Sequence, residues 1–246
     1  MLDYLQKAKR PLSLNLIPVS RELRLLVLAP HPDDFDAVGV TLRYFYDLGC
    51  RIDLAVVTSG ASGVEDLFSG TPDLAVKAAI REEEQRASCR FFGLPDANLT
   101  FLRLPEDEEG HPMESAENAE RIRRCLAENR PQIVFLPHGN DSNAGHRRTY
   151  AMFREYARMN STPLAAFLNC DPKTIQMRPD LYTVFEQDAA DWKGRLLRFH
   201  QSQHQRNLRT RQHGFDERIL AVNRAIGAEL SPPAAYAEVF ELEFFG

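Results

Sequence analysis

The sequence predicts an α/β fold built on a doubly wound, mostly parallel sheet, and three observations support this. First, short continuous apolar runs, such as LRLLVL at residues 23–28, are typical of strands buried on both faces. Second, helical segments alternate with these runs, which favours parallel pairing. Third, three of the runs end in polar loops rich in Gly, Pro or His, and open parallel sheets bind ligands at that edge.

The elements follow from these patterns in chain order. Apolar runs predict strands at residues 23–28, 51–58 and 132–136, with helices at residues 37–48, 73–92 and 115–128. The pattern is less regular after Pro163, where we expect strands at residues 164–168, 181–185 and 236–242 and helices at residues 189–200 and 215–227. No repeat or low-complexity linker divides the chain. We therefore expect one domain over residues 1–246, with a core at about 20–160 and a C-terminal elaboration of helices and strands at about 161–246.

The composition excludes several classes of protein. Among 246 residues, 43% are hydrophobic and 26% are charged, as in ordinary globular proteins, and the net charge of −5 argues against nucleic acid as a partner. The four cysteines form no CxxC pair, so we expect reduced thiols rather than a disulfide scaffold. Neither a signal peptide nor a run of roughly 20 apolar residues is evident, which predicts a cytoplasmic protein without a membrane span.

Candidate metal ligands lie directly after the first predicted strand, in the segment HPDD. This segment contains His31, Asp33 and Asp34. Catalytic zinc sites typically use three imidazole or carboxylate ligands and leave one position for water. A further ligand is expected from the loop PHGNDSNAGHRRTY at the same sheet edge, which offers His138, Asp141 and His146. Taken alone, the HPDD carboxylates could instead cap a helix N-terminus.

Several segments together resemble the LmbE-like de-N-acetylases, a family that includes the N-acetylglucosaminyl-phosphatidylinositol deacetylases. HPDD is similar to the family's AHPDDE signature, TSG at residues 58–60 to its TxG loop, and Arg81 with Glu84 to its RxxE helix. ENRPQIVFLPH followed by His146 resembles its second metal motif. Lys193, HQSQ at residues 200–203 and YAEVF at residues 236–240 resemble a K…HxSQ…YAExF pattern. The resemblance covers nearly the whole chain.

The resemblance implies a Rossmann-like fold and one Zn²⁺ per chain, although another divalent metal would suit the same donors. Carried over by motif, the ligands are His31, Asp34 and His146, and Asp33 is the general base. The implied reaction is hydrolysis of an N-acyl group, usually N-acetyl, on a small amino sugar or glycoconjugate. Zinc lowers the pKa of its water toward about 7, so a nearby carboxylate can accept the proton. Relatives of this type often assemble, so a homo-oligomer is also implied.

The sequence departs from the family pattern at two places. Phe35 stands where AHPDDE has Glu, and Asp36 follows it. The family's second motif commonly ends in HxDH, whereas Asn143 and Gly145 precede the last histidine here. The first histidine of that ending is thought to polarise the carbonyl or donate a proton. Asn143 can hydrogen-bond an oxyanion but cannot supply a titrating proton.

Other side chains could supply what these departures remove. Asp141, Asp36 or His138 could substitute, with Asp33 moving the proton in both directions. Loss of the carboxylate at Gly145 removes a group that would orient the neighbouring histidine. The candidate substrate-binding residues are Arg81, His138, Asp141 and His200.

Each weaker feature also has an ordinary structural explanation. Arg81 and Glu84 are one helical turn apart and could form an intrahelical ion pair instead of facing a pocket. His200 could pack within a helix. We expect surface positions for His111, His204 and His213. One arginine cluster either forms a solvated helix face, the commoner arrangement, or meets an anion, and it comprises Arg195, Arg198, Arg206, Arg209 and Arg211.

Three other functions remain open from the sequence. Asn143 and Gly145 suggest a non-catalytic, sugar- or ligand-binding member of the same fold. Similar zinc ligands also serve phosphoester hydrolysis. A nucleotide-binding module is weakest, because SGASG at residues 59–63 lacks both the GxGxxG and GK[ST] fingerprints.

Overall fold

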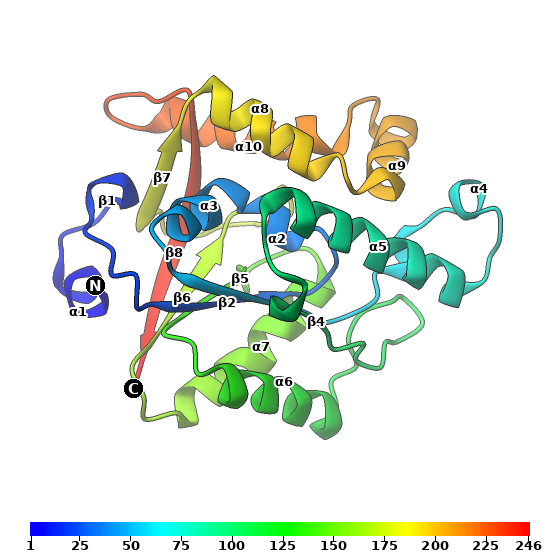
Figure 1. Ribbon diagram of the computed structural model, residues 1–246, viewed down its shortest axis with the longest axis horizontal. Helices are drawn as coiled ribbons and strands as arrows, with labels where there is room; N and C mark the ends of the chain where they lie inside the picture. The colour runs from blue at the N-terminus through cyan, green and yellow to red at the C-terminus, as the bar shows by residue number, and fades with distance from the viewer.

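A computed structural model describes residues 1–246 and contains one eight-stranded sheet with helices on both faces (Figure 1). The strands are β1 (Leu12–Ser13), β2 (Arg24–Ala29), β3 (Arg51–Val56), β4 (Leu99–Phe101), β5 (Ile133–Pro137), β6 (Leu164–Asn169), β7 (Leu181–Phe185) and β8 (Tyr236–Phe245). Their order is β1-β7-β8-β6-β5-β2-β3-β4. β8 is antiparallel to both of its neighbours, β6 and β7, and all other neighbouring pairs are parallel.

The helices form layers on the two faces of the sheet. They are α1 (Leu2–Lys7), α2 (Asp34–Ala37), α3 (Gly39–Asp47), α4 (Asp66–Ser69), α5 (Leu74–Phe92), α6 (Ala116–Asn129), α7 (Ala144–Met159), α8 (Gln187–Leu197), α9 (Gln201–Arg211) and α10 (Phe215–Glu229), with short 3-10 turns η1 (Leu14–Leu16), η2 (Ala61–Gly63) and η3 (Asp96–Asn98). Figure 1 shows α6 and α7 together on one face, with α3 and α5 on the other. α8 packs against α2, α3 and α5, so the C-terminal helices add an outer layer on that side.

The central strands read as continuous apolar runs because both of their faces are covered. Leu25 and Val27 of β2 belong to the larger core cluster, whereas Leu26 and Leu28 belong to the cluster shared with α6 and α7. β3, β5 and β6 alternate between the same two clusters. This arrangement is expected of parallel strands that carry helices on both sides.

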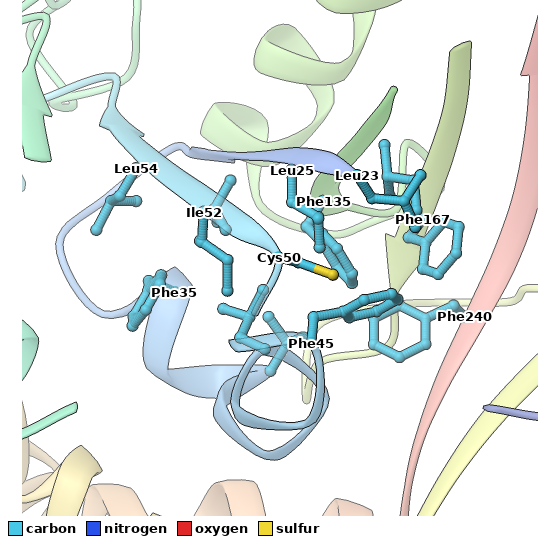
Figure 2. Packing of buried hydrophobic residues seen from close by; sticks show 14 of the residues in the cluster. Leu23, Leu25, Phe35, Phe45, Cys50, Ile52, Leu54, Phe135, Phe167 and Phe240 are labelled. Carbon is cyan, nitrogen blue, oxygen red and sulfur yellow. The ribbon is translucent and has the colours of Figure 1, made fainter. Parts of the chain in front are cut away.

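Aromatic side chains from different elements meet in the larger cluster (Figure 2). The Phe135 and Phe240 rings lie 5.5 Å apart, centroid to centroid, in an edge-to-face arrangement. Phe45 of α3 and Phe167 of β6 pack against the same group. The final strand β8 is therefore fastened to the sheet by apolar packing as well as by hydrogen bonds.

The predicted fold class is confirmed, and the predicted strands and helices are found close to their expected places. The helices and strands that were not predicted are α1, β1, α2, α4, β4, α7 and α9. α7 begins at Ala144, inside a segment interpreted from the sequence as a loop. No helix is long and apolar enough to cross a bilayer, and all four cysteines are unpaired.

The topology places the loops after β2 and β5 at one point. β2 lies between β3 and β5, so the chain winds outward from β2 to β3 and β4 on one side and through β5 and β6 on the other. The carboxyl ends of β2 and β5 form the switch point, where open α/β sheets bind ligands. HPDD follows β2, and the segment leading to His146 follows β5.

Candidate metal centre and active site

The three predicted metal ligands come together at the switch point. One ligand atom from each of His31, Asp34 and His146 lies within 4.8 Å of the others. The Asp34 carboxylate lies between the rings, with Oδ1 3.5 Å from His146 Nε2 and Oδ2 3.3 Å from His31 Nδ1. Two imidazoles and one carboxylate are a donor set that suits catalytic zinc, so the residues present fit the metal.

Two carboxylates contact the His146 ring at Nδ1, the nitrogen that does not face Asp34. His146 Nδ1 lies 3.0 Å from Asp141 Oδ2 and 3.5 Å from Asp171 Oδ2. These contacts leave Nε2 facing Asp34, an arrangement common for metal-binding histidines. The carboxylate that the family motif carries at Gly145 is thus replaced here by two that are more distant in the sequence.

The charges around His146 favour a cation at this place. Burial opposes charge on the ring, but Asp34, Asp141 and Asp171 outweigh it and raise the pKa of His146 to about 10. Burial also favours neutral Asp34, yet the two histidines hold the pKa of Asp34 well below its ordinary value. Without a metal, a proton on His146 therefore supplies the positive charge that these carboxylates require.

Gly145 permits the close approach of the loop to the first ligand. A Cβ atom at Gly145 would lie 2.9 Å from His31 Nε2 and 3.1 Å from Asn143 Oδ1. Both distances are shorter than ordinary van der Waals contact. A side chain at position 145 therefore requires either His31 or the loop to move.

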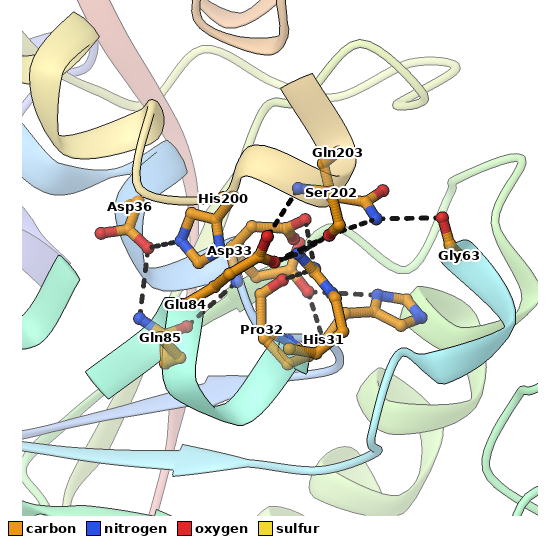
Figure 3. A network of polar contacts seen from close by, with 12 residues as sticks. His31, Pro32, Asp33, Asp36, Gly63, Glu84, Gln85, His200, Ser202 and Gln203 are labelled. Atoms are coloured by element: carbon orange, nitrogen blue, oxygen red, sulfur yellow. Dashed lines mark hydrogen bonds and ion pairs between the residues drawn. The ribbon is translucent and has the colours of Figure 1, made fainter. Parts of the chain in front are cut away.

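Asp33 lies beside the three candidate ligands His31, Asp34 and His146, which together form the metal cluster of this protein. Its backbone conformation is unusual, with φ of 114°. Its N–H donates to Gln85 Oε1 at 3.0 Å, and its Oδ2 accepts from Arg81 Nη2 at 2.7 Å. Figure 3 shows Gln85 beside the HPDD segment within this polar network. Such backbone strain persists only where the surroundings enforce it, and here α5 supplies both contacts.

Arg81 forms the intrahelical ion pair with Glu84 and also lines the cavity. The sequence left these two roles open as alternatives, and the structure shows both. Arg81 is 1% exposed, and its Nη1 donates to Glu84 Oε2 at 2.9 Å. It also donates to the Pro32 carbonyl. Burial disfavours its charge, but Asp33 and Glu84 more than compensate and raise the pKa of Arg81.

Asn143 caps α7 and borders the same cavity. Its Oδ1 accepts a hydrogen bond from the Gly145 N–H at 2.8 Å. The acceptor role fixes which end of the amide is oxygen, and the –NH₂ group is left with no hydrogen-bond partner in the chain. That group can donate to a molecule in the cavity.

The cavity above these residues has a volume of about 540 Å³. The metal cluster lies at its base, and loops at residues 60–63, 109–111 and 171–173 form part of its rim. One face of α9 and one face of α10 form a further wall. Volumes of this order hold small organic molecules.

A comparison with protein families matches the PIG-L model, described as GlcNAc-PI de-N-acetylase, over residues 26–157. The match covers more than half of the chain. This protein belongs to the PIG-L family. The resemblance stated from the sequence is thereby confirmed, and the matched region contains all three candidate ligands. A comparison with curated protein sequences found no significant match.

Solved structures of PIG-L-like folds agree with the architecture. The N,N'-diacetylchitobiose deacetylase from Pyrococcus horikoshii is 21% identical, with a TM-score of 0.72 over 89% of this chain and 83% of that chain. A structure described as the zinc-inhibited form of teicoplanin deacetylase Orf2 is 16% identical, with a TM-score of 0.64 over 90% of this chain and 98% of that chain.

The same fold also occurs in an enzyme of another class. GalB, the 4-carboxy-2-hydroxymuconate hydratase from Pseudomonas putida KT2440, is 18% identical, with a TM-score of 0.59 over 90% of this chain and 95% of that chain. At these identities the likeness shows the fold alone. One fold thus carries different chemistries, which depend on the residues of each site.

Three of the four residues predicted to bind substrate lie outside the cavity lining of this PIG-L protein. His138 Nε2 contacts Glu241 Oε2 of β8 at 3.2 Å. Asp141 is buried behind His146. His200, the N-cap residue of α9, is fully buried, and its Nε2 lies 2.5 Å from Asp36 Oδ2. Arg81 alone of the four borders the cavity.

The departure from the PIG-L motif at the end of the HPDD segment has a structural explanation. Phe35 is fully buried and packs edge-to-face on Phe92 with 5.0 Å between ring centroids, so it belongs to the apolar core. Asp36 is also fully buried and accepts from Gln85 and Ser88. None of the three suggested substitutes lines the cavity, so the geometry does not support direct proton transfer from Asp36, Asp141 or His138 to substrate.

Several cavity residues were not predicted as site residues. They include Asp171, Lys173, Arg206, Arg211, Arg218 and also His111, which we expected at the surface. Of these six, only Arg206 and Arg211 carried a signal, through the arginine cluster that could have met an anion. The other four lie in segments without a motif.

Proposed function

We propose that this protein is a metal-dependent N-deacetylase that removes an acetyl group from an amino sugar or related glycoconjugate, with zinc as the metal. The observation that carries the proposal is the grouping of His31, Asp34 and His146 with Asp33 at the base of one cavity. Membership of a family described as de-N-acetylases and a deacetylase among the structural neighbours support it.

Each residue at the base of the cavity has a separate task in this proposal. His31, Asp34 and His146 hold the metal, and Asp141 with Asp171 keeps the His146 ring in place. When bound, zinc would supply an acidified water and a Lewis acid for the amide carbonyl.

Proton movement is assigned to Asp33. Its carboxylate accepts the proton of the attacking water as the new C–O bond forms, and returns that proton to the amine nitrogen as the C–N bond breaks. Arg81 stays charged beside it and fixes the carboxylate through Oδ2. The –NH₂ group of Asn143 donates to the carbonyl oxygen as negative charge develops there.

An acetate-release assay on metal-replete protein with a panel of N-acetylated sugars tests the proposal. We expect Asp33→Asn to lower kcat by about 10² to 10⁴-fold, the usual contribution of general acid–base catalysis, without loss of bound zinc by elemental analysis. His146→Ala should instead lose the zinc. Glu117→Gln, on the first turn of α6, is the control.

The same experiment separates the alternatives. Absence of acetate release from every sugar, with zinc bound, would leave the non-catalytic binding member as the better account. Release of phosphate from phosphorylated sugars instead of acetate would indicate phosphoester hydrolysis. Manganese, cobalt and iron reconstitution decides whether zinc is the active metal.

A further inference from the structure

Four lysine and arginine side chains border the cavity without a carboxylate partner. Lys173, Arg206, Arg211 and Arg218 form no ion pair within 4.0 Å, whereas Arg81, the remaining arginine of the cavity lining, is paired with Asp33. Neighbouring arginines show that acidic partners are available to this part of the chain. Arg198 Nε lies 2.7 Å from Asp216, and Arg209 is paired with Glu65.

The unpaired arginines lie on helix faces that are turned toward the cavity. Gln203, Arg206, Asn207 and Thr210 of α9 are spaced i, i+3, i+4 and i+7, and all four line the cavity. Such residues share one face of a helix. Arg218 lies in the first turns of α10, and Arg211 ends α9, so both face the cavity from the connection between the two helices.

The position of this wall is fixed by polar anchors. Ser202 Oγ donates to Glu84 Oε2 at 2.7 Å, and Gln203 Nε2 donates to the Gly63 carbonyl at 3.1 Å (Figure 3). Arg206 Nη1 donates to the same carbonyl at 3.3 Å. The guanidinium groups are therefore carried on a helix that is held in place against α5 and η2.

The charges of the arginines act on one another. The Arg218 side chain makes no hydrogen bond within the chain, and burial, followed by the charges of Arg211 and Arg206, lowers its pKa. Asp171 and Asp33 act in the opposite direction. Cations held together in this way repel, and an anion bound among them offsets both the repulsion and the cost of removing the charges from water.

The acids that border the cavity are engaged elsewhere. Asp33 contacts Arg81, Asp34 lies between two histidines, and Asp171 contacts His146. The Glu109 side chain is 80% exposed and lies 3.8 Å from His111. The cavity therefore has a carboxylate-rich base and a wall of unpaired guanidinium groups.

We propose that Arg206, Arg211 and Arg218 bind an anionic group of the substrate, a phosphate or a carboxylate, while its N-acetyl group lies at the metal cluster. Guanidinium groups pair with both kinds of anion through two parallel hydrogen bonds. This inference rests on the proposed function and narrows its substrate to N-acetylated sugars that carry a negative charge.

Turnover of matched substrates tests the inference. The charged probes are N-acetylglucosamine 1-phosphate and carboxymethyl N-acetylglucosaminide, and methyl N-acetylglucosaminide is the neutral probe. We expect kcat/KM to favour at least one charged probe by about 10- to 100-fold, the usual range for charge-assisted hydrogen bonds. The charged probe that is preferred identifies the anion as phosphate or carboxylate.

The preference for the charged probe should fall in three single variants and in the triple variant; the single variants are Arg206→Gln, Arg211→Gln and Arg218→Gln. We expect Arg218→Gln alone to reduce the preference by about 10-fold. Turnover of the neutral probe should stay within about two-fold. Arg209→Gln is the matched control, because Arg209 lies on α9 but is paired with Glu65. Melting temperatures verify that each variant is folded.

Binding to the metal-free protein separates this inference from the proposed function. Calorimetry with the same probes should show tighter binding of a charged probe, and the triple variant should lose that difference. If no probe is hydrolysed but this pattern holds, the anion site stands and the deacetylase proposal fails. If charged and neutral probes are hydrolysed equally, or bind equally, in wild type and variants, the anion site is overturned.

Discussion

Three carboxylates surround His146, and their positions have a consequence for metal binding. They raise the pKa of His146 to about 10, so the metal-free protein carries a proton on this ring at neutral pH. A metal needs the neutral imidazole and must displace that proton. In the metal-free protein this charge stabilises the fold fully below the ordinary pKa of 6.5, and the contribution is lost as pH rises through about 10.

We therefore expect zinc binding at pH 8 to release about one proton, measured by calorimetry in two buffers of different ionisation enthalpy. Asp141→Asn keeps the shape of the side chain but removes its negative charge, which should lower the pKa of His146. Proton release on zinc binding should therefore decline at a lower pH than in wild type. Glu109→Gln, which borders the cavity away from His146, should leave the release unchanged. Release near zero at pH 8 would contradict this account of His146.

Gly145 is the second residue whose replacement has a geometric consequence. A methyl group there would lie 2.9 Å from His31 Nε2, so Gly145→Ala should displace the ring and weaken zinc binding by about 10- to 100-fold. Competition with a zinc indicator measures this. The control is Gly194→Ala in α8, where the nearest atom would be 3.6 Å away and ordinary contact results. Equal zinc affinity in both variants would show that the loop adapts.

At the scale of elements, α9 depends on polar contacts at its N-terminus. Ser202 and His200 are buried there, whereas Leu208 is its single large apolar residue and is 41% exposed. Ser202→Ala removes one hydrogen bond to Glu84 and should cost about 1 kcal/mol. Hydrogen exchange should then accelerate in residues 201–207. Gln205→Ala, on the exposed side of α9, is the control and should change neither the free energy of unfolding nor the hydrogen exchange of α9. If Ser202→Ala accelerated exchange uniformly across the chain, local anchoring of α9 would be contradicted.

The elements that could be predicted are those whose burial follows a simple pattern. β2, β3 and β5 are covered on both faces and appear as apolar runs, and α5 and α6 start at Asp73 and Ser115, whose side chains cap them. α9 could not be predicted, because the face that it turns inward borders a polar cavity and is itself polar. α7 was missed because its first turn lies within the metal motif.

The same reasoning separates predictable from unpredictable site residues. His31, Asp34 and His146 follow strand ends within recognisable motifs, so the topology alone brings them together. Asp171 and Arg218 come from the C-terminal part of the chain, and only tertiary packing places them at the cavity. No local sequence pattern identifies either of them.

At the scale of the whole molecule, β8 joins the C-terminal part to the core. Its Phe240 packs on Phe135 of β5 and Phe167 of β6, which come earlier in the chain. Phe240→Ala should lower the free energy of unfolding by about 3 to 5 kcal/mol, measured by denaturant titration. Phe68→Ala is the matched control, because Phe68 is 37% exposed and should cost much less. Similar losses for both would show that β8 contributes little to the core.

The weak apolar attachment of α9 bears on how this protein could change its substrate over evolution. A helix whose inner face contributes little to the apolar core can exchange the residues of that face at small cost in folding stability, since large losses arise mainly from core cavities and buried unpaired groups. Positions 206, 207 and 210 are therefore open to substitution while the metal cluster, held by β2, β5 and α5, stays intact. One catalytic centre could in this way serve a succession of different conjugates.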